Sequence, residues 1–221
     1  KTLWIGSECT FFIKSKRLPN IDKKSALQSF FSLGPYNASP IVNEKIKKTT
    51  EIIAEEFNLV NTPILIQAII EKDDVYIIEF APRVGGGLAF REIEHHTGFD
   101  MIDAVIDSYM GNKISQNKSQ ATSHLSSVTH FFGTSGNLEN VEGLDELVKS
   151  NIIKEFHLHK TKGMAITSED LASRNRIFGV IVLGENIQEI KDKLDKVVKG
   201  VKVINSNGEN VFLKVSFDEL I

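Results

Sequence analysis

Two apolar stretches that follow each other closely constrain this sequence more than any other feature. Residues 64–70 and 75–81 are rich in isoleucine, valine and aromatic side chains, and only the charged residues 71–74 separate them. Residues of these types favour β-strands. The short polar connection predicts a β-hairpin, and Pro82 is expected to end its second strand.

One polar side chain interrupts each of these strands, Gln67 in the first and Glu79 in the second. A carboxylate in an apolar strand is costly if it is desolvated and unpaired, so we expect Glu79 to face water, a cation or a metal. Mg²⁺ takes oxygen ligands and often shares them with substrate phosphates. A carboxylate and an amide oxygen on neighbouring strands therefore suit it.

The two side chains can bind one ion only if they lie on the same face of the hairpin. Residues directly opposite each other in an antiparallel pair point to the same side. Pairing Gln67 with Glu79 in a regular ladder requires Glu71 opposite Val75 and a three-residue loop over residues 72–74. A two-residue loop would place them on opposite faces and remove the argument for a metal site.

Residues that can bind an anion come directly after the hairpin in the sequence. Arg83 lies four residues after Glu79, and its planar fork matches phosphate or carboxylate oxygens. The next residues allow close backbone approach and lead into a helix amino terminus, which favours an anion: Gly85, Gly86 and Gly87. Arg91, one helical turn further, is a candidate for contacting a substrate carboxylate. Metal, guanidinium and amide donors are thus expected to converge on one phosphorylated group.

The run IIEFAPRVGGG over residues 77–87, followed by TGFD at 97–100 and MG at 110–111, resembles the final active-site strand and following helices of ATP-grasp enzymes. The likeness is greatest to the carbamoyl-phosphate-synthase-like and amino-acid-ligase branches. It covers residues 40–111 well and the remainder in layout.

This resemblance implies roles for the residues named above. Glu79 and Gln67 match the ligands of Mg²⁺, or alternatively Mn²⁺, between the phosphates of ATP. Arg83 matches the catalytic arginine that contacts the transferred phosphate or acyl phosphate, and the three glycines match the adjacent binding loop. The sequence departs from many relatives at Ala81, where they carry an asparagine ligand. A structural alternative is a salt bridge between Glu79 and Arg83.

The expected fold class is α+β, with an antiparallel sheet and helices. The polar stretch 112–123 has little to bury, so we place a boundary near residue 118. Residues 1–118 then form a partial ATP-grasp domain and residues 119–221 a smaller α+β subdomain. Further helices are predicted at 41–58, 85–94, 100–109, 144–149 and 187–199, and strands at 9–13, 125–132, 152–159, 176–183, 201–204 and 210–215.

The resemblance implies an ATP-dependent ligase that joins a small-molecule carboxylate to an amine through an acyl phosphate. Only 66 residues precede Gln67, too few for the upstream half of the nucleotide cleft. We therefore expect a carboxyl-terminal piece of a longer protein that is inactive alone. The alternatives are a carbamate-phosphorylating enzyme and a non-catalytic module for dimerisation or regulation, and a homodimer is left open.

Composition argues against several partners. The net charge of -3 provides no basic field for a nucleic acid. The lone Cys9 cannot form an internal disulfide, which favours a reducing compartment such as the cytoplasm. No apolar run approaches the roughly 20 residues of a membrane helix.

One further pattern involves His157 and His159, which alternate on a predicted strand and so share a face. Two imidazoles are compatible with a metal site, but no third ligand stands nearby in the sequence. A solvated face is therefore the favoured interpretation.

Overall fold

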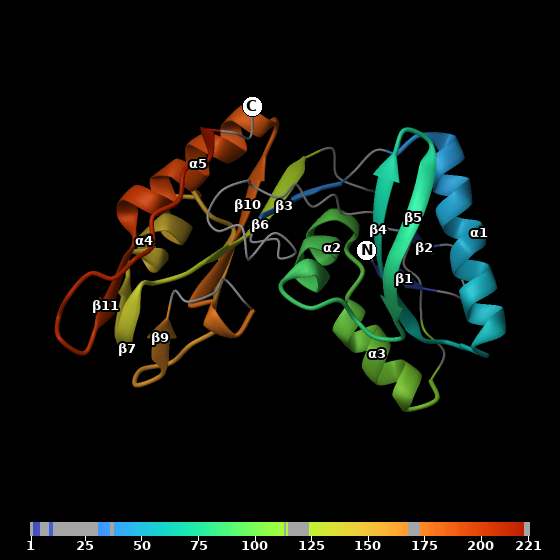
Figure 1. Cartoon of the computed structure of the whole chain (residues 1–221), viewed down its shortest axis with the longest axis horizontal. Helices are drawn as coiled ribbons and strands as arrows, with labels where there is room; N and C mark the ends of the chain where they lie inside the picture. The colour runs from blue at the N-terminus through green and yellow to red at the C-terminus, as the bar shows by residue number, and fades with distance from the viewer. Residues whose placement is uncertain are drawn as a thin grey trace. The chain divides into compact units, whose positions relative to one another are not determined.

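The computed structural model describes residues 2–4, 9–10, 31–35, 38–112, 114, 124–167 and 173–218. The chain forms two compact units (Figure 1). The amino-terminal unit comprises Lys1–Lys14 and Pro35–Thr122, and the carboxyl-terminal unit comprises Ser15–Gly34 and Ser123–Ile221. The predicted boundary near residue 118 lies outside the described residues, and the proposed domain limits stay a prediction.

The amino-terminal unit contains a four-stranded antiparallel sheet in the order β2-β1-β4-β5. Helix α1 packs along the β4–β5 hairpin (Figure 1), and Ala54 of the helix meets Ile64 and Ile66 in a small core. The elements are β1 (Thr2–Trp4), β2 (Cys9–Thr10), α1 (Pro40–Glu56), β4 (Pro63–Glu71) and β5 (Asp74–Ala81).

Helix α1 begins where the sequence indicates. The Ser39 side chain caps it by accepting a hydrogen bond from the Val42 amide at 3.3 Å, and Pro40 occupies the first turn, where its missing N–H costs nothing. The same end is tied to the hairpin turn, because Lys45 Nζ donates to Asp73 O at 2.8 Å and to Asp74 Oδ1 at 2.7 Å. The helix ends at Glu56, slightly earlier than predicted.

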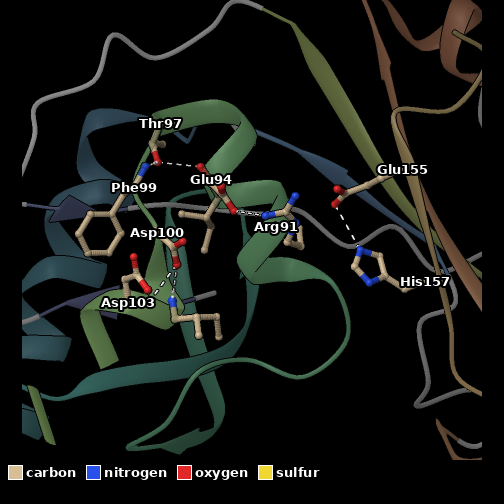
Figure 2. A network of polar contacts seen from close by, with 10 residues as sticks. Arg91, Glu94, Thr97, Phe99, Asp100, Asp103, Glu155 and His157 are labelled. Carbon is tan, nitrogen blue, oxygen red and sulfur yellow. Dashed lines mark hydrogen bonds and ion pairs between the residues drawn. The ribbon is translucent and has the colours of Figure 1, made fainter. Parts of the chain in front are cut away.

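Two short helices follow the hairpin, α2 (Ala89–Thr97) and α3 (Met101–Tyr109). Gly98 ends α2 with a φ of 66°, and Asp100 caps α3 by accepting hydrogen bonds from two amides (Figure 2). The helices bury Ile93, Phe99, Met101 and Ala104 in a second small core. Both helices were predicted from the sequence.

The carboxyl-terminal unit has two antiparallel sheets, ordered β3-β6-β10-β8 and β11-β7-β9. Helix α5 buries Ile190, Leu194 and Val197 in the large hydrophobic core of this unit. The elements are β3 (Phe31–Gly34), β6 (Leu125–Phe131), β7 (Ser135–Glu142), α4 (Leu144–Lys149), β8 (Glu155–Leu158), β9 (Ala165–Thr167), the 3₁₀ turn η2 (Ser173–Asn175), β10 (Phe178–Gly184), α5 (Ile187–Gly200) and β11 (Lys202–Asn205).

The α+β class is confirmed, and several predicted elements need correction. The strand expected at 152–159 is limited to β8, and the strand expected at 210–215 is wrong, because Asn210 and Phe212 make only isolated bridges. Residues 11–13 of the strand predicted at 9–13 lie outside the described residues. Strands β3, β7 and β9 were not predicted. Among the described residues, no helix is long and apolar enough to span a bilayer.

The packing of α4 against α5 can be tested at a pair of glycines. Gly143 and Gly163 have φ values of 92° and 89°, so alanine is strained at either position by about 1–2 kcal/mol. A Cβ at Gly143 would also lie 2.3 Å from the Gly200 carbonyl oxygen, whereas nothing lies within 4 Å at Gly163. We therefore expect Gly143→Ala to lower the free energy of unfolding clearly more than Gly163→Ala in urea denaturation. Equal losses would contradict this close approach.

Candidate functional site

The candidate site lies on the exposed face of the β4–β5 hairpin. Gln67 and Glu79 are directly opposite each other in the strand register, and both residues are exposed. Ile64 and Ile66 of β4 point to the other face, toward α1. The structure therefore brings together the two residues predicted to bind a metal.

The predicted three-residue loop over residues 72–74, with Glu71 opposite Val75, is wrong. Glu71 pairs with Asp74, so the turn has two residues, and Lys72 adopts a positive φ of 53°. A regular ladder from this turn would place Gln67 opposite Ile78 and put Glu79 on the other face.

A β-bulge corrects the register. Ala68 pairs with Ile77, but Gln67 pairs with Glu79, so that Ile78 is an extra residue in β5. As a result Ile78 and Glu79 are both exposed, while Ile77 and Phe80 both pack against the core under α1. Bulges of this kind commonly re-aim a side chain beside a binding site.

Arg83 follows the hairpin in a tight turn, in which its amide donates to Ala81 O at 2.8 Å. Its guanidinium is exposed and donates to Val84 O at 2.9 Å. Within the described part of the chain, Arg83 and Glu79 form no ion pair, so the salt-bridge alternative finds no support. Both charged groups point into solvent-accessible space.

The three glycines lead into α2 as predicted. Gly85 is buried, Gly86 has nothing within 4 Å of a would-be Cβ, and Gly87 adopts a φ of 73° that suits glycine. The residue before the helix, Leu88, supplies no side-chain cap to the amides of the first turn.

Arg91 lies on the first turn of α2 and is half-buried. Its Nη1 contacts Glu94 Oε2 in an ion pair within the same helix (Figure 2). The glutamate partner offsets the charge that was expected to meet a substrate carboxylate. Binding of a substrate by Arg91 stays a prediction and requires competition with Glu94.

An apolar patch that was missed in the sequence lies on the same face as Gln67 and Glu79. It consists of Ile69, Tyr76 and Ile78, which are 57%, 54% and 52% exposed. Ile69 and Tyr76 pair directly across the hairpin. Exposed apolar side chains that gather beside polar ones often mark a binding surface. Alternation from Gln67 could have placed Ile69 on this face, but Tyr76 and Ile78 share the face of Glu79 only because of the bulge.

The hairpin alone offers two oxygen ligands. Among the described residues, no group of three or more histidine, cysteine, aspartate or glutamate side chains could hold a metal ion. Two protein oxygens suit Mg²⁺, which keeps water and binds substrate phosphates in its remaining positions. The chemistry of Gln67 and Glu79 therefore fits a magnesium ion that arrives with a phosphorylated substrate.

No family model matches this chain. It is 24% identical over 197 residues to an N5-carboxyaminoimidazole ribonucleotide synthase of Saccharolobus solfataricus, covering 89% of this chain and 45% of that protein. The chain thus spans about half the length of this curated relative.

Solved structures are similar over a comparable part. A phosphoribosylglycinamide synthetase from Anaerococcus prevotii matches with a TM-score of 0.68 and 22% identity, over 80% of this chain and 46% of that one. An L-amino acid ligase from Bacillus licheniformis matches with a TM-score of 0.66 and 15% identity, over 81% and 45%. A biotin carboxylase domain from Hydrogenobacter thermophilus, solved with MgADP, matches with a TM-score of 0.59 and 16% identity, over 84% and 40%.

The exposed position of Glu79 makes a prediction about stability. Glu79→Gln should change the free energy of unfolding by less than about 0.5 kcal/mol, because the side chain is exposed and has no hydrogen-bond or ion-pair partner among the described residues. Glu92, in α2, is 0% exposed, and Glu92→Gln should cost at least about 1 kcal/mol. Urea denaturation of both variants measures the difference. A large loss for Glu79→Gln would assign that carboxylate a structural role.

Proposed function

We propose that the chain contributes the metal-binding hairpin of an ATP-dependent carboxylate–amine ligase, because its fold is that of the carboxyl-terminal part of ATP-grasp ligases. The resemblance predicted from residues 77–87 is thereby confirmed at the level of the fold. The observation that carries the proposal is the register that places Gln67 opposite Glu79 on an exposed face.

The metal site would consist of the Glu79 carboxylate and the Gln67 amide oxygen, with Mn²⁺ as an alternative to Mg²⁺. When bound, the ion neutralises charge on the phosphates of ATP. With Ala81 in place of the asparagine of many relatives, the hairpin supplies two ligands and no third.

The reaction would proceed in two steps. A substrate carboxylate oxygen attacks the γ-phosphorus of ATP, which gives an acyl phosphate and releases ADP. An amine then attacks the acyl carbon, the C–N bond forms and phosphate leaves. Arg83 and the amides near Gly85, Gly86 and Gly87 would bind the transferred phosphate oxygens and stabilise their charge.

The apolar patch extends this assignment to the rest of the nucleotide. Ile69 and Ile78 lie on the same face as the metal pair and keep about half of their surface exposed. A planar base could cover this surface, and its burial would be favourable by the hydrophobic effect. The other wall of the cleft would come from protein outside this chain, which spans about half of its relatives. Carbamate phosphorylation would use the same residues and stays an alternative.

The metal assignment is tested by turnover. In the full-length gene product, Glu79→Ala should lower ATP-dependent product formation at least about 100-fold, since a lost charge-stabilising group at the reacting phosphate has effects of this size. Glu71→Ala is the matched control, because Glu71 is also an exposed strand glutamate but lies beside the turn. It should leave turnover nearly unchanged. Retained activity in Glu79→Ala would show that the ligand assignment is wrong.

Calorimetric titration with MgATP tests the division of the cleft. We expect binding to the full-length gene product and at least about tenfold weaker binding to this chain, because the proposed other wall of the cleft would be absent. Equal affinity for the two proteins would mean that this chain builds the whole nucleotide site.

A further inference from the structure

Three histidines lie on one face of the sheet β3-β6-β10-β8. His130 of β6 and His157 of β8 both lie opposite Gly179 of the central strand β10. Opposite residues share a face, and His159, two residues after His157, points the same way. Gly179 contributes no side chain between these two imidazoles. The sequence next to His157 and His159 contains no third histidine. In the structure the third one, His130, comes from strand β6.

Two of these imidazoles contact each other. His130 Nδ1 lies 3.2 Å from His159 Nε2, and the ring centroids are 5.2 Å apart. His130 is only 5% exposed. One ring must donate and the other accept, so a single proton is shared between the two nitrogens.

Arg176 lies at the same end of this sheet. The Ile177 amide donates to Phe131 O at 2.9 Å, and the His159 amide donates to Ile177 O at 2.8 Å. These bonds place Ile177, the residue after Arg176, between Phe131 and His159, so the main chain of Arg176 lies at this end of the sheet. Arg176 Nε is buried and has no hydrogen-bond partner in the described part of the chain.

The cluster is positively charged and desolvated. Burial, and after it the charge of Arg176, lowers the pKa of His130 to about 2, and the same causes lower the pKa of His159. Burial also lowers the pKa of Arg176. The neighbouring carboxylate of Glu155 contacts His157 Nε2 at 3.4 Å (Figure 2). Within the described residues no carboxylate forms an ion pair with Arg176, and an uncompensated buried charge is costly.

We infer that His130, His159 and Arg176 form a binding site for an oxyanion, a carboxylate or phosphate group of a small molecule. The guanidinium fork matches either group in geometry and charge, and it would supply the Nε–H that lacks an acceptor. A metal ion is disfavoured because the guanidinium repels cations. All three residues belong to the carboxyl-terminal unit, and this site does not depend on the metal site at Glu79.

The site can be tested on this chain by nuclear magnetic resonance at constant ionic strength in chloride. Orthophosphate and acetate are titrated separately, and the imidazole signals of His130 and His159 and the Nε–H signal of Arg176 are followed. We expect saturable shifts with at least one anion. Saturation by phosphate alone would identify a phosphorylated ligand, and saturation by acetate alone would identify a carboxylate.

Matched variants assign the effect to Arg176. Arg176→Gln should weaken binding at least about tenfold, as expected for loss of a charge-assisted contact. Arg176→Lys keeps the positive charge but loses the planar guanidinium. Its anion affinity should lie between those of the unchanged protein and Arg176→Gln. Arg174→Gln removes an exposed arginine two residues away and should bind like the unchanged protein. Circular dichroism checks that each variant is folded, and Arg176→Lys serves if Arg176→Gln does not fold.

Two results would overturn the inference. One is that neither anion shifts these signals, or that Arg176→Gln binds as tightly as the unchanged protein. The other is that Glu169→Gln or Asp170→Asn moves the Arg176 Nε–H signal without added anion. Residues 168–172 lie outside the described residues, and such a change would show that a carboxylate of the chain itself occupies the site.

Discussion

The register of the β4–β5 hairpin is the constraint on which the candidate site depends. Side chains alternate between the faces of a strand, so a shift by one residue moves every side chain to the opposite face. The two-residue turn by itself would separate Gln67 from Glu79. The extra residue Ile78 restores their pairing, and the chemistry of the exposed face follows from that single insertion.

The bulge is held in place by packing on the opposite face. Ile77 and Phe80 are three residues apart and both pack against the core under α1, which is compatible only with an extra residue between them. Phe80 also meets Phe57 edge-to-face at a centroid distance of 5.0 Å. Lys45 joins the start of α1 to the turn. Core packing and turn contacts thus fix the position of Gln67 and Glu79, whose side chains have no partner in the described part of the chain.

Local patterns in the sequence were enough to predict the hairpin, the glycine-rich turn and the helices, because each has a periodicity or a cap that is visible over a few residues. The turn length was not visible, since Lys72 adopts a positive φ without the glycine or asparagine that usually signals it. Strand β7 was missed because the segment SGNLENVE lacks alternation. The partner of His159 is 29 residues away in the sequence, and only strand pairing brings it into contact.

The contact between His130 and His159 also determines the hydrogen-bonding roles of their two remaining ring nitrogens. When both rings are neutral, the ring that donates across the bridge has an acceptor nitrogen left over, and the ring that accepts has a donor left over. Reversing the bridge exchanges these two roles but never produces two donors. The two remaining ring nitrogens of the pair therefore always comprise one donor and one acceptor, whichever ring donates across the contact.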